Sequence, residues 1–152
     1  MTDLPYRKGT ILIPSGPCKH LHIICNDPVF YPNNGKECVL AVNISSINLG
    51  VPHDEECLLS VGDHPFIKHP SFVMYSRADI FGAVAIARSI DDGTFAPHDP
   101  ASEELLSRVL AGFEVSDRVK YKVLLSELTL FGLIITICIK WIGCAQSALW
   151  SR

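Results

Sequence analysis

The sequence lacks several patterns that would assign a function directly. None of its six cysteines is spaced as a Cys-x-x-Cys pair, so neither a zinc ribbon nor a thioredoxin-like redox motif is indicated. Asp and Glu number 16 against 13 Lys and Arg, which gives a formal net charge of -3. Nucleic acid would therefore have to bind through a local basic groove rather than through the overall field of the protein. Internal repeats and low-complexity tracts are also lacking.

An export signal of the secretory type is not evident either. Residues 1–8 are polar and hold no apolar stretch, whereas a signal peptide needs one. We therefore expect a cytoplasmic protein whose cysteines are reduced rather than paired in disulfides. Apolar residues make up 48% of the chain and charged residues 19%, which is typical of a globular protein.

Short apolar runs separated by Gly, Pro and Asn turn signals recur over residues 9–87. Such runs, rich in β-branched residues and partly alternating, are typical of strands. Strands are predicted at 9–14, 20–25, 38–44, 57–61 and 71–75, with a further strand or a short helix at 78–87. Strands of this length and spacing predict a small barrel or two packed sheets. The residues expected to be mostly buried are Ile11, Ile13, Leu21, Ile23, Val39, Ala41, Leu58 and Val73.

The composition changes after residue 97, where a helical segment is predicted. Ser102 followed by two glutamates is typical of a helix start, and a second helix is expected after Ser116. We therefore divide the chain into a β-domain, residues 1–97, and a helical segment, residues 98–152. Residues 128–142 are almost wholly apolar. They are shorter than a membrane span, so we favour a buried or partner-covered helix. A membrane anchor through 128–146 and a tail of atypical packing are the alternatives.

Four segments in order resemble the MazF/PemK-like toxin family. They are Lys8-Gly9-Thr10-Ile11-Leu12, the run from Lys19 to Asp27, Val42-Asn43-Ile44-Ser45-Ser46, and the run from His64 to Tyr75. The resemblance implies a mainly β fold, a small SH3-like barrel over residues 8–90 followed by C-terminal helices. It also implies cleavage of single-stranded RNA without a metal ion or other cofactor, an antitoxin protein as partner, and a homodimer.

Residues for that chemistry follow from matching these segments. A base must take the proton of a ribose 2′-OH, a cation must stabilise the phosphorane, and an acid must protonate the leaving oxygen. The family's Arg is replaced by Lys19 or His20, and its Thr or Ser corresponds to Ser45 or Ser46. The predicted catalytic residues are Lys19, His20, Ser45, Ser46 and His64. Of these, Lys19, His20, Ser45 and His64 are expected to converge on one concave face. The predicted substrate-binding residues are His22, Lys68, Ser71, Tyr75 and Arg77.

A different class of function stays open beside this one. The missing Arg and the acidic net charge favour a non-catalytic barrel that binds a protein or nucleic-acid partner. His20 and His22 form a His-x-His pattern, but no third ligand is fixed by spacing, so we predict no metal site. Each of the named side chains also has a structural alternative as strand surface, turn or core residue. A membrane-tethered version of either protein is the third alternative.

Overall fold

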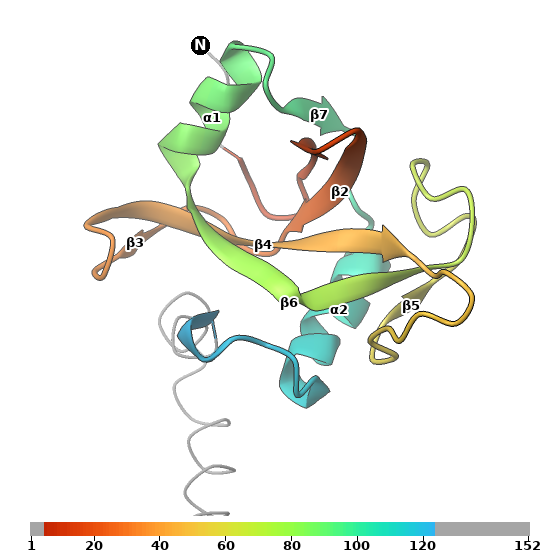
Figure 1. Ribbon diagram of the computed structural model, residues 1–152. Helices are drawn as coiled ribbons and strands as arrows, with labels where there is room; N and C mark the ends of the chain where they lie inside the picture. Colours follow the sequence, from red (N-terminus) through yellow and green to blue (C-terminus); the bar gives the residue numbers. More distant parts are fainter. Residues whose placement is uncertain (1–4, 124–152) are drawn as a thin grey trace, which may run out of the picture.

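Seven β-strands and two helices form the part of the chain that the computed structural model describes, residues 5–123 (Figure 1). The strands are β1 Thr10–Ser15, β2 Cys18–Ile24, β3 Val29–Tyr31, β4 Lys36–Ser46, β5 Leu58–Leu59, β6 Ser71–Gly82 and β7 Ala96–His98. The helices are α1 Ala83–Asp91 and α2 Glu103–Val115.

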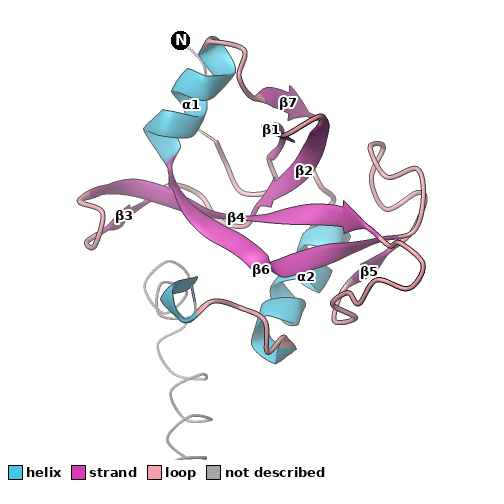
Figure 2. Ribbon diagram, viewed as in Figure 1, coloured by secondary structure: helices cyan, strands magenta, loops and turns pink. Residues whose placement is uncertain are grey.

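The strands form one antiparallel sheet that curls into a half-barrel. Their order is β5-β6-β4-β2-β1-β7, and β3 pairs with β4 outside this path. All of the pairings are antiparallel. Figure 2 shows the long strands β4 and β6 crossing the middle of the molecule, with β1, β2 and β7 turned away from them. The predicted mainly β class followed by helices is therefore confirmed, as a curled half-barrel with short helices.

Alternation along the strands produces two hydrophobic clusters, one on each face of the sheet. In β2, Leu21 and Ile23 join the larger cluster with α2, whereas Ile24 joins the smaller cluster with α1. The central strand β4 is buried from Cys38 to Ile44, because both of its faces are covered. Each face of the sheet thus forms one hydrophobic core with one helix, α2 on one face and α1 on the other.

A bulge in β6 sharpens the curl of the sheet. Asn43 of β4 pairs with Met74, but Ala41 pairs with Asp79, so residues 75–78 of β6 lie opposite Val42 alone. Extra residues of this kind bend a strand and increase its twist. Within the bulge, Tyr75 is buried, whereas the next two residues, Ser76 and Arg77, are exposed.

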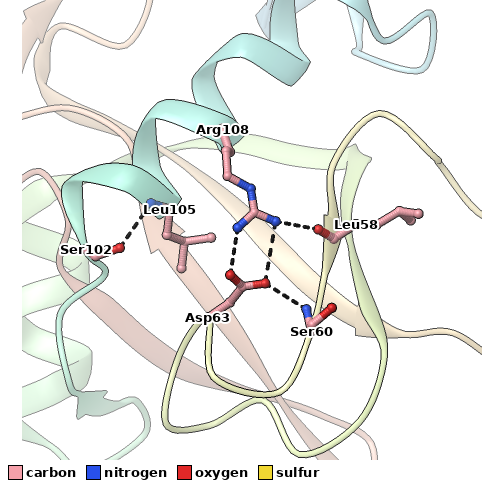
Figure 3. Close-up of polar contacts among 6 residues, drawn as sticks. All are labelled: Leu58, Ser60, Asp63, Ser102, Leu105 and Arg108. Atoms are coloured by element: carbon pink, nitrogen blue, oxygen red, sulfur yellow. Dashed lines mark hydrogen bonds and ion pairs between the residues drawn. The ribbon is translucent and has the colours of Figure 1, made fainter.

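Polar contacts fix α2 to the rest of the fold (Figure 3). Ser102 caps the helix by accepting a hydrogen bond from the Leu105 amide at 3.0 Å. Arg108 reaches the Asp63 carboxylate with N–O distances of 2.7 and 3.5 Å and donates to the Leu58 carbonyl at 2.6 Å. The edge strand β5 is therefore held to the helix by one guanidinium group.

Tyr75 joins α2 to the centre of the sheet. Its hydroxyl donates a hydrogen bond to the Val109 carbonyl at 2.9 Å, and its ring meets Phe113 edge to face at 4.9 Å. This close approach requires glycine at position 112, where a Cβ atom would overlap the tyrosine hydroxyl. The helix is thus seated on β6 by a contact that has no room for a larger residue.

The strand predictions are confirmed in outline and corrected in detail. Of the core residues expected, Leu58 is wrong: it is 46% exposed, while its neighbour Leu59 is 1% exposed. In the short edge strand β5 successive side chains point to opposite faces, and Leu59 faces the core. Ile13 is only half-buried. For the segment 78–87, a strand or a short helix is predicted, and the structure contains both. β6 runs to Gly82, and α1 begins at Ala83.

Two further predictions concern the C-terminal part of the chain, where the described residues end at 123. Of the helix predicted after Ser116, the described residues contain only a helical turn at 121–123. The apolar segment 128–142 lies outside residues 5–123. Within those residues, no helix has the length and apolar character needed to cross a membrane. Among the four cysteines they contain, none is joined to another by a disulfide.

Candidate functional site

The start of β2 and the end of β4 separate from each other. These strands pair at only three positions, the last of which is His22 opposite Asn43. Beyond it, β2 stays paired with β1 as far as Cys18, and β4 stays paired with β6 as far as Ser46. The pair β1–β2 and the pair β4–β6 therefore diverge, and an opening is left between β2 and β4.

A pocket of about 520 Å³ occupies this opening, and we call it the split pocket. The loop before β6 supplies its remaining wall, including Phe66 and Ile67. No Asp or Glu side chain is among its described lining residues, so the local charge is positive although the chain as a whole is acidic. Its ionisable and hydroxyl-bearing lining residues are Cys18, Lys19, His20, Ser45, Ser46, Lys68, His69 and Ser71.

Six of the residues predicted from the sequence line the split pocket: Lys19, His20, Ser45, Ser46, Lys68 and Ser71. They come from the start of β2, the end of β4, the loop before β6 and the first residue of β6. Ser71 is buried and donates its hydroxyl to the His69 carbonyl at 3.0 Å, so it shapes the wall of the pocket. The two lysines are exposed and His20 is half-buried.

His64 is not brought to this pocket. Its side chain is 2% exposed, and both ring nitrogens bond to the main chain. Nδ1 accepts from the Phe66 amide at 3.1 Å, so the ring proton lies on Nε2, which donates to the Asp99 carbonyl at 2.6 Å. The structure therefore gives His64 the turn-and-backbone arrangement that was its structural alternative, and the predicted convergence does not include it.

His69 was missed by the sequence reasoning. It is exposed and lines the split pocket beside Lys68. The signal was present, because His69 precedes Pro70 just as His64 precedes Pro65. Since Ser46 pairs with Ser71, a residue two places before Ser71 had to fall near the end of β4.

Tyr75 is likewise withdrawn from solvent. Its side chain is fully buried under α2, and burial raises the pKa of its hydroxyl well above the ordinary value. A buried ring cannot stack on a base in a surface groove, so the predicted substrate contact is replaced by a packing contact with the helix.

A second pocket, of about 350 Å³, lies next to the bulge in β6. Its lining residue Ile13 packs against the cluster that contains Ile86 of α1, so the pocket is on the α1 side of the sheet. We call it the bulge pocket. It holds the remaining predicted residues, His22 and Arg77, and His20 lines both pockets. Its other lining residues are Ile13, Pro14, Ser15, Asn43 and Met74. The two pockets therefore meet at His20.

Burial lowers the pKa of His22 below its ordinary value, so this imidazole is neutral at pH 7. Its Nδ1 lies 3.1 Å from the His20 carbonyl oxygen. A carbonyl oxygen only accepts hydrogen bonds, so Nδ1 carries the proton and Nε2 is left as an acceptor. His22 thus offers the bulge pocket an imidazole of defined tautomer.

Comparison with protein-family models, curated proteins and solved structures gives no match to this chain. Within residues 5–123, no three His, Cys, Asp or Glu side chains are grouped as a metal site would require. The chemistry of the site is therefore argued from the two pockets themselves. Lysines, imidazoles and hydroxyls facing one hollow suit a ligand with negatively charged oxygens, such as a phosphodiester.

Proposed function

We propose that this chain is an endoribonuclease of the MazF/PemK-like type that cleaves single-stranded RNA in the split pocket. The observation that carries the proposal is the meeting of two imidazoles, His20 and His69, with two lysines in a pocket whose described lining has no carboxylate. Transfer of a phosphoryl group to a neighbouring ribose hydroxyl needs a base, an acid and a cation at one phosphate. The split pocket offers all three.

The reaction needs no group from outside the substrate and these side chains. One imidazole takes the proton of the 2′-OH, whose oxygen attacks the adjacent phosphorus. The bond from phosphorus to the 5′-oxygen breaks as the other imidazole, entering as imidazolium, protonates that oxygen. The products are a 2′,3′-cyclic phosphate and a 5′-hydroxyl, and the two imidazoles have exchanged protonation states. Lys19 and Lys68 stabilise the phosphorane, and the hydroxyl of Ser45 donates to one of its oxygens.

The same proposal assigns the half-barrel to the SH3-like barrels, on the resemblance and on the strong bend at the β6 bulge. A protein antitoxin, a second copy of the chain and a cytoplasmic location stay predictions that accompany it.

The test is cleavage of a short single-stranded RNA by the purified chain in the presence of a chelator. We expect a product ending in a 2′,3′-cyclic phosphate and a bell-shaped dependence of kcat on pH. His20→Ala and His69→Ala should each lower kcat by about a hundredfold. The matched control is His53→Ala, because His53 lines neither pocket and its replacement should leave kcat unchanged.

Two results would overturn the proposal. One is cleavage of a 2′-O-methyl RNA, which has no attacking hydroxyl. The other is an intact substrate after incubation with a folded protein.

Binding of RNA without cleavage is the second candidate function, and one observation favours it. Among the described residues that line the two pockets, Arg77 of the bulge pocket is the one arginine, so the described cations of the split pocket are lysines. Lysine neutralises phosphate without the two-pronged geometry of a guanidinium. A chain that binds single-stranded RNA in a salt-dependent way but leaves it whole would be this binding module.

A further inference from the structure

The bulge pocket contains a buried acceptor without a partner. Asn43 is 9% exposed, and its side-chain oxygen accepts no hydrogen bond from any described residue. Such a group in the interior is unfavourable by about 1–3 kcal/mol, and native structures seldom retain one without a reason. An aliphatic residue of similar size would avoid this penalty, as Val39 and Ala41 do on the same face of β4.

The position of Asn43 connects it with a ligand rather than with the core. Its neighbours in the sheet are His22 on β2 and Met74 on β6, and all three line the bulge pocket. A half-turn of the carboxamide about its Cβ–Cγ bond exchanges its oxygen and nitrogen, so either end can be turned to the pocket. The Nε2 atom of neutral His22 is a second acceptor on the same strand pair.

The rest of the pocket matches a flat ring joined to an anion. Ile13, Pro14 and Met74 supply apolar surface, and methionine sulfur packs favourably against aromatic rings. Arg77 is exposed on the β6 bulge, a feature that often redirects a side chain next to a binding site. An apolar pocket with a few placed polar groups is the usual form of a small-molecule site.

We propose that the bulge pocket is a base-reading subsite, in which the Asn43 carboxamide and His22 recognise the exocyclic amino group of a nucleobase while Arg77 contacts a phosphate. An amino group has two N–H donors and so can serve two acceptors, whereas uracil offers a single ring N–H. The inference rests on the proposed RNA substrate. Because His20 lines both pockets, the base that is read lies next to the phosphate that is cleaved.

The experiment measures binding of short 2′-O-methyl oligonucleotides of adenosine, cytidine and uridine by fluorescence anisotropy. These ligands lack the attacking hydroxyl, so binding is observed whether or not the chain is a nuclease. We expect the adenosine and cytidine ligands to bind about tenfold more tightly than the uridine ligand. Asn43→Leu should abolish this preference, so that the three ligands bind about equally. It should leave the melting temperature unchanged or raised, because it removes the unpaired acceptor.

Arg77→Ala is the matched variant. It should weaken binding of all three ligands by the same factor and reduce the slope of binding against salt by about one ion. Equal binding of the three ligands by the unmodified chain, or an amino-base preference that survives Asn43→Leu, would overturn the subsite. A selective chain that cleaves no ribo-oligonucleotide would refute the nuclease and leave the subsite standing. Failure to bind any of the three ligands would defeat both.

Discussion

Replacing Gly112 with alanine tests how α2 is seated on the sheet. In the interior of a helix, alanine is favoured over glycine by about 1 kcal/mol, so helix propensity alone predicts a more stable protein. The structure predicts the opposite sign. A Cβ atom at 112 would overlap the hydroxyl oxygen of Tyr75 and would lie 2.9 Å from its Cε2 atom. The ring is fully buried, so it cannot swing into solvent.

The expected loss combines two effects. Moving Tyr75 breaks its hydrogen bond to Val109, which contributes about 0.5–1.5 kcal/mol, and overpacking a filled core destabilises by about 1–3 kcal/mol. After the gain in helix propensity, Gly112→Ala should lower the free energy of unfolding by about 1–3 kcal/mol. In urea this shifts the unfolding midpoint downward by about 1 M.

Urea unfolding followed by far-ultraviolet circular dichroism measures this shift. Ala111→Gly is the matched control, because Ala111 is exposed on the same helix and should lose only the propensity difference of about 1 kcal/mol. Tyr75→Phe combined with Gly112→Ala should recover part of the loss, since the overlapping oxygen is gone. A Gly112→Ala protein as stable as the unmodified chain would refute the seating of α2 described above.

Three further predictions concern residues outside the pockets. His64→Ala should lower the free energy of unfolding by about 2–4 kcal/mol, because it empties a buried site with two hydrogen bonds; thermal melting would show this, and an unchanged melting temperature would contradict it. Asn26→Ala should lower it by about 1–3 kcal/mol, because the buried Leu40 amide now donates to the Asn26 oxygen at 2.7 Å; hydrogen exchange at the Leu40 amide should accelerate in step. The hydrogen bond from Arg108 is the main cause of a lowered pKa of Asp63 in the folded protein. At pH values above the unfolded pKa, near 4, this partly exposed pair should therefore contribute about 0.5–1 kcal/mol to the free energy of unfolding. The contribution should disappear as the pH falls through the lower pKa of the folded state. Asp63→Asn should therefore be less stable than the unmodified chain at pH 7 and equally stable in strong acid; a gap in stability that persisted there would contradict the pairing.

Residues whose environment is set by their own strand were predictable from the sequence. Alternation in β2 placed Leu21 and Ile23 inside and left His20 and His22 facing away from the main core, as the structure has them. Alternation could not decide between Leu58 and Leu59, because two adjacent leucines fit either phase. In a strand of two residues, only its pairing with Phe72 and Ser71 on β6 fixes which one faces inward.

The residues of the candidate site were likewise predictable only where local strand pairing places them. The lysine and histidine at the start of β2 and the serines at the end of β4 could be brought together from the antiparallel pairing of neighbouring strands. The two His-Pro pairs could not be told apart, since nothing local distinguishes His64 from His69. What encloses His64 is the carbonyl of Asp99, which lies on a segment that follows β7 and is distant in sequence. Asn43 was passed over because its significance depends on a missing partner rather than on a motif.

The half-barrel has consequences for how the protein behaves in a crowded solution. A sheet that does not close on itself presents main-chain donors and acceptors along its outermost strands, and these can template pairing between molecules. Here the sheet ends in β5, which has two residues, and β7, which has three residues and contains Pro97. β3, which pairs with β4 alone, also has three residues. A neighbouring molecule that tried to continue the ladder would find few groups to bond, and proline would remove one of the donors. The brevity of the outermost strands thus guards against fibril-like growth while leaving the groove between β2 and β4 open.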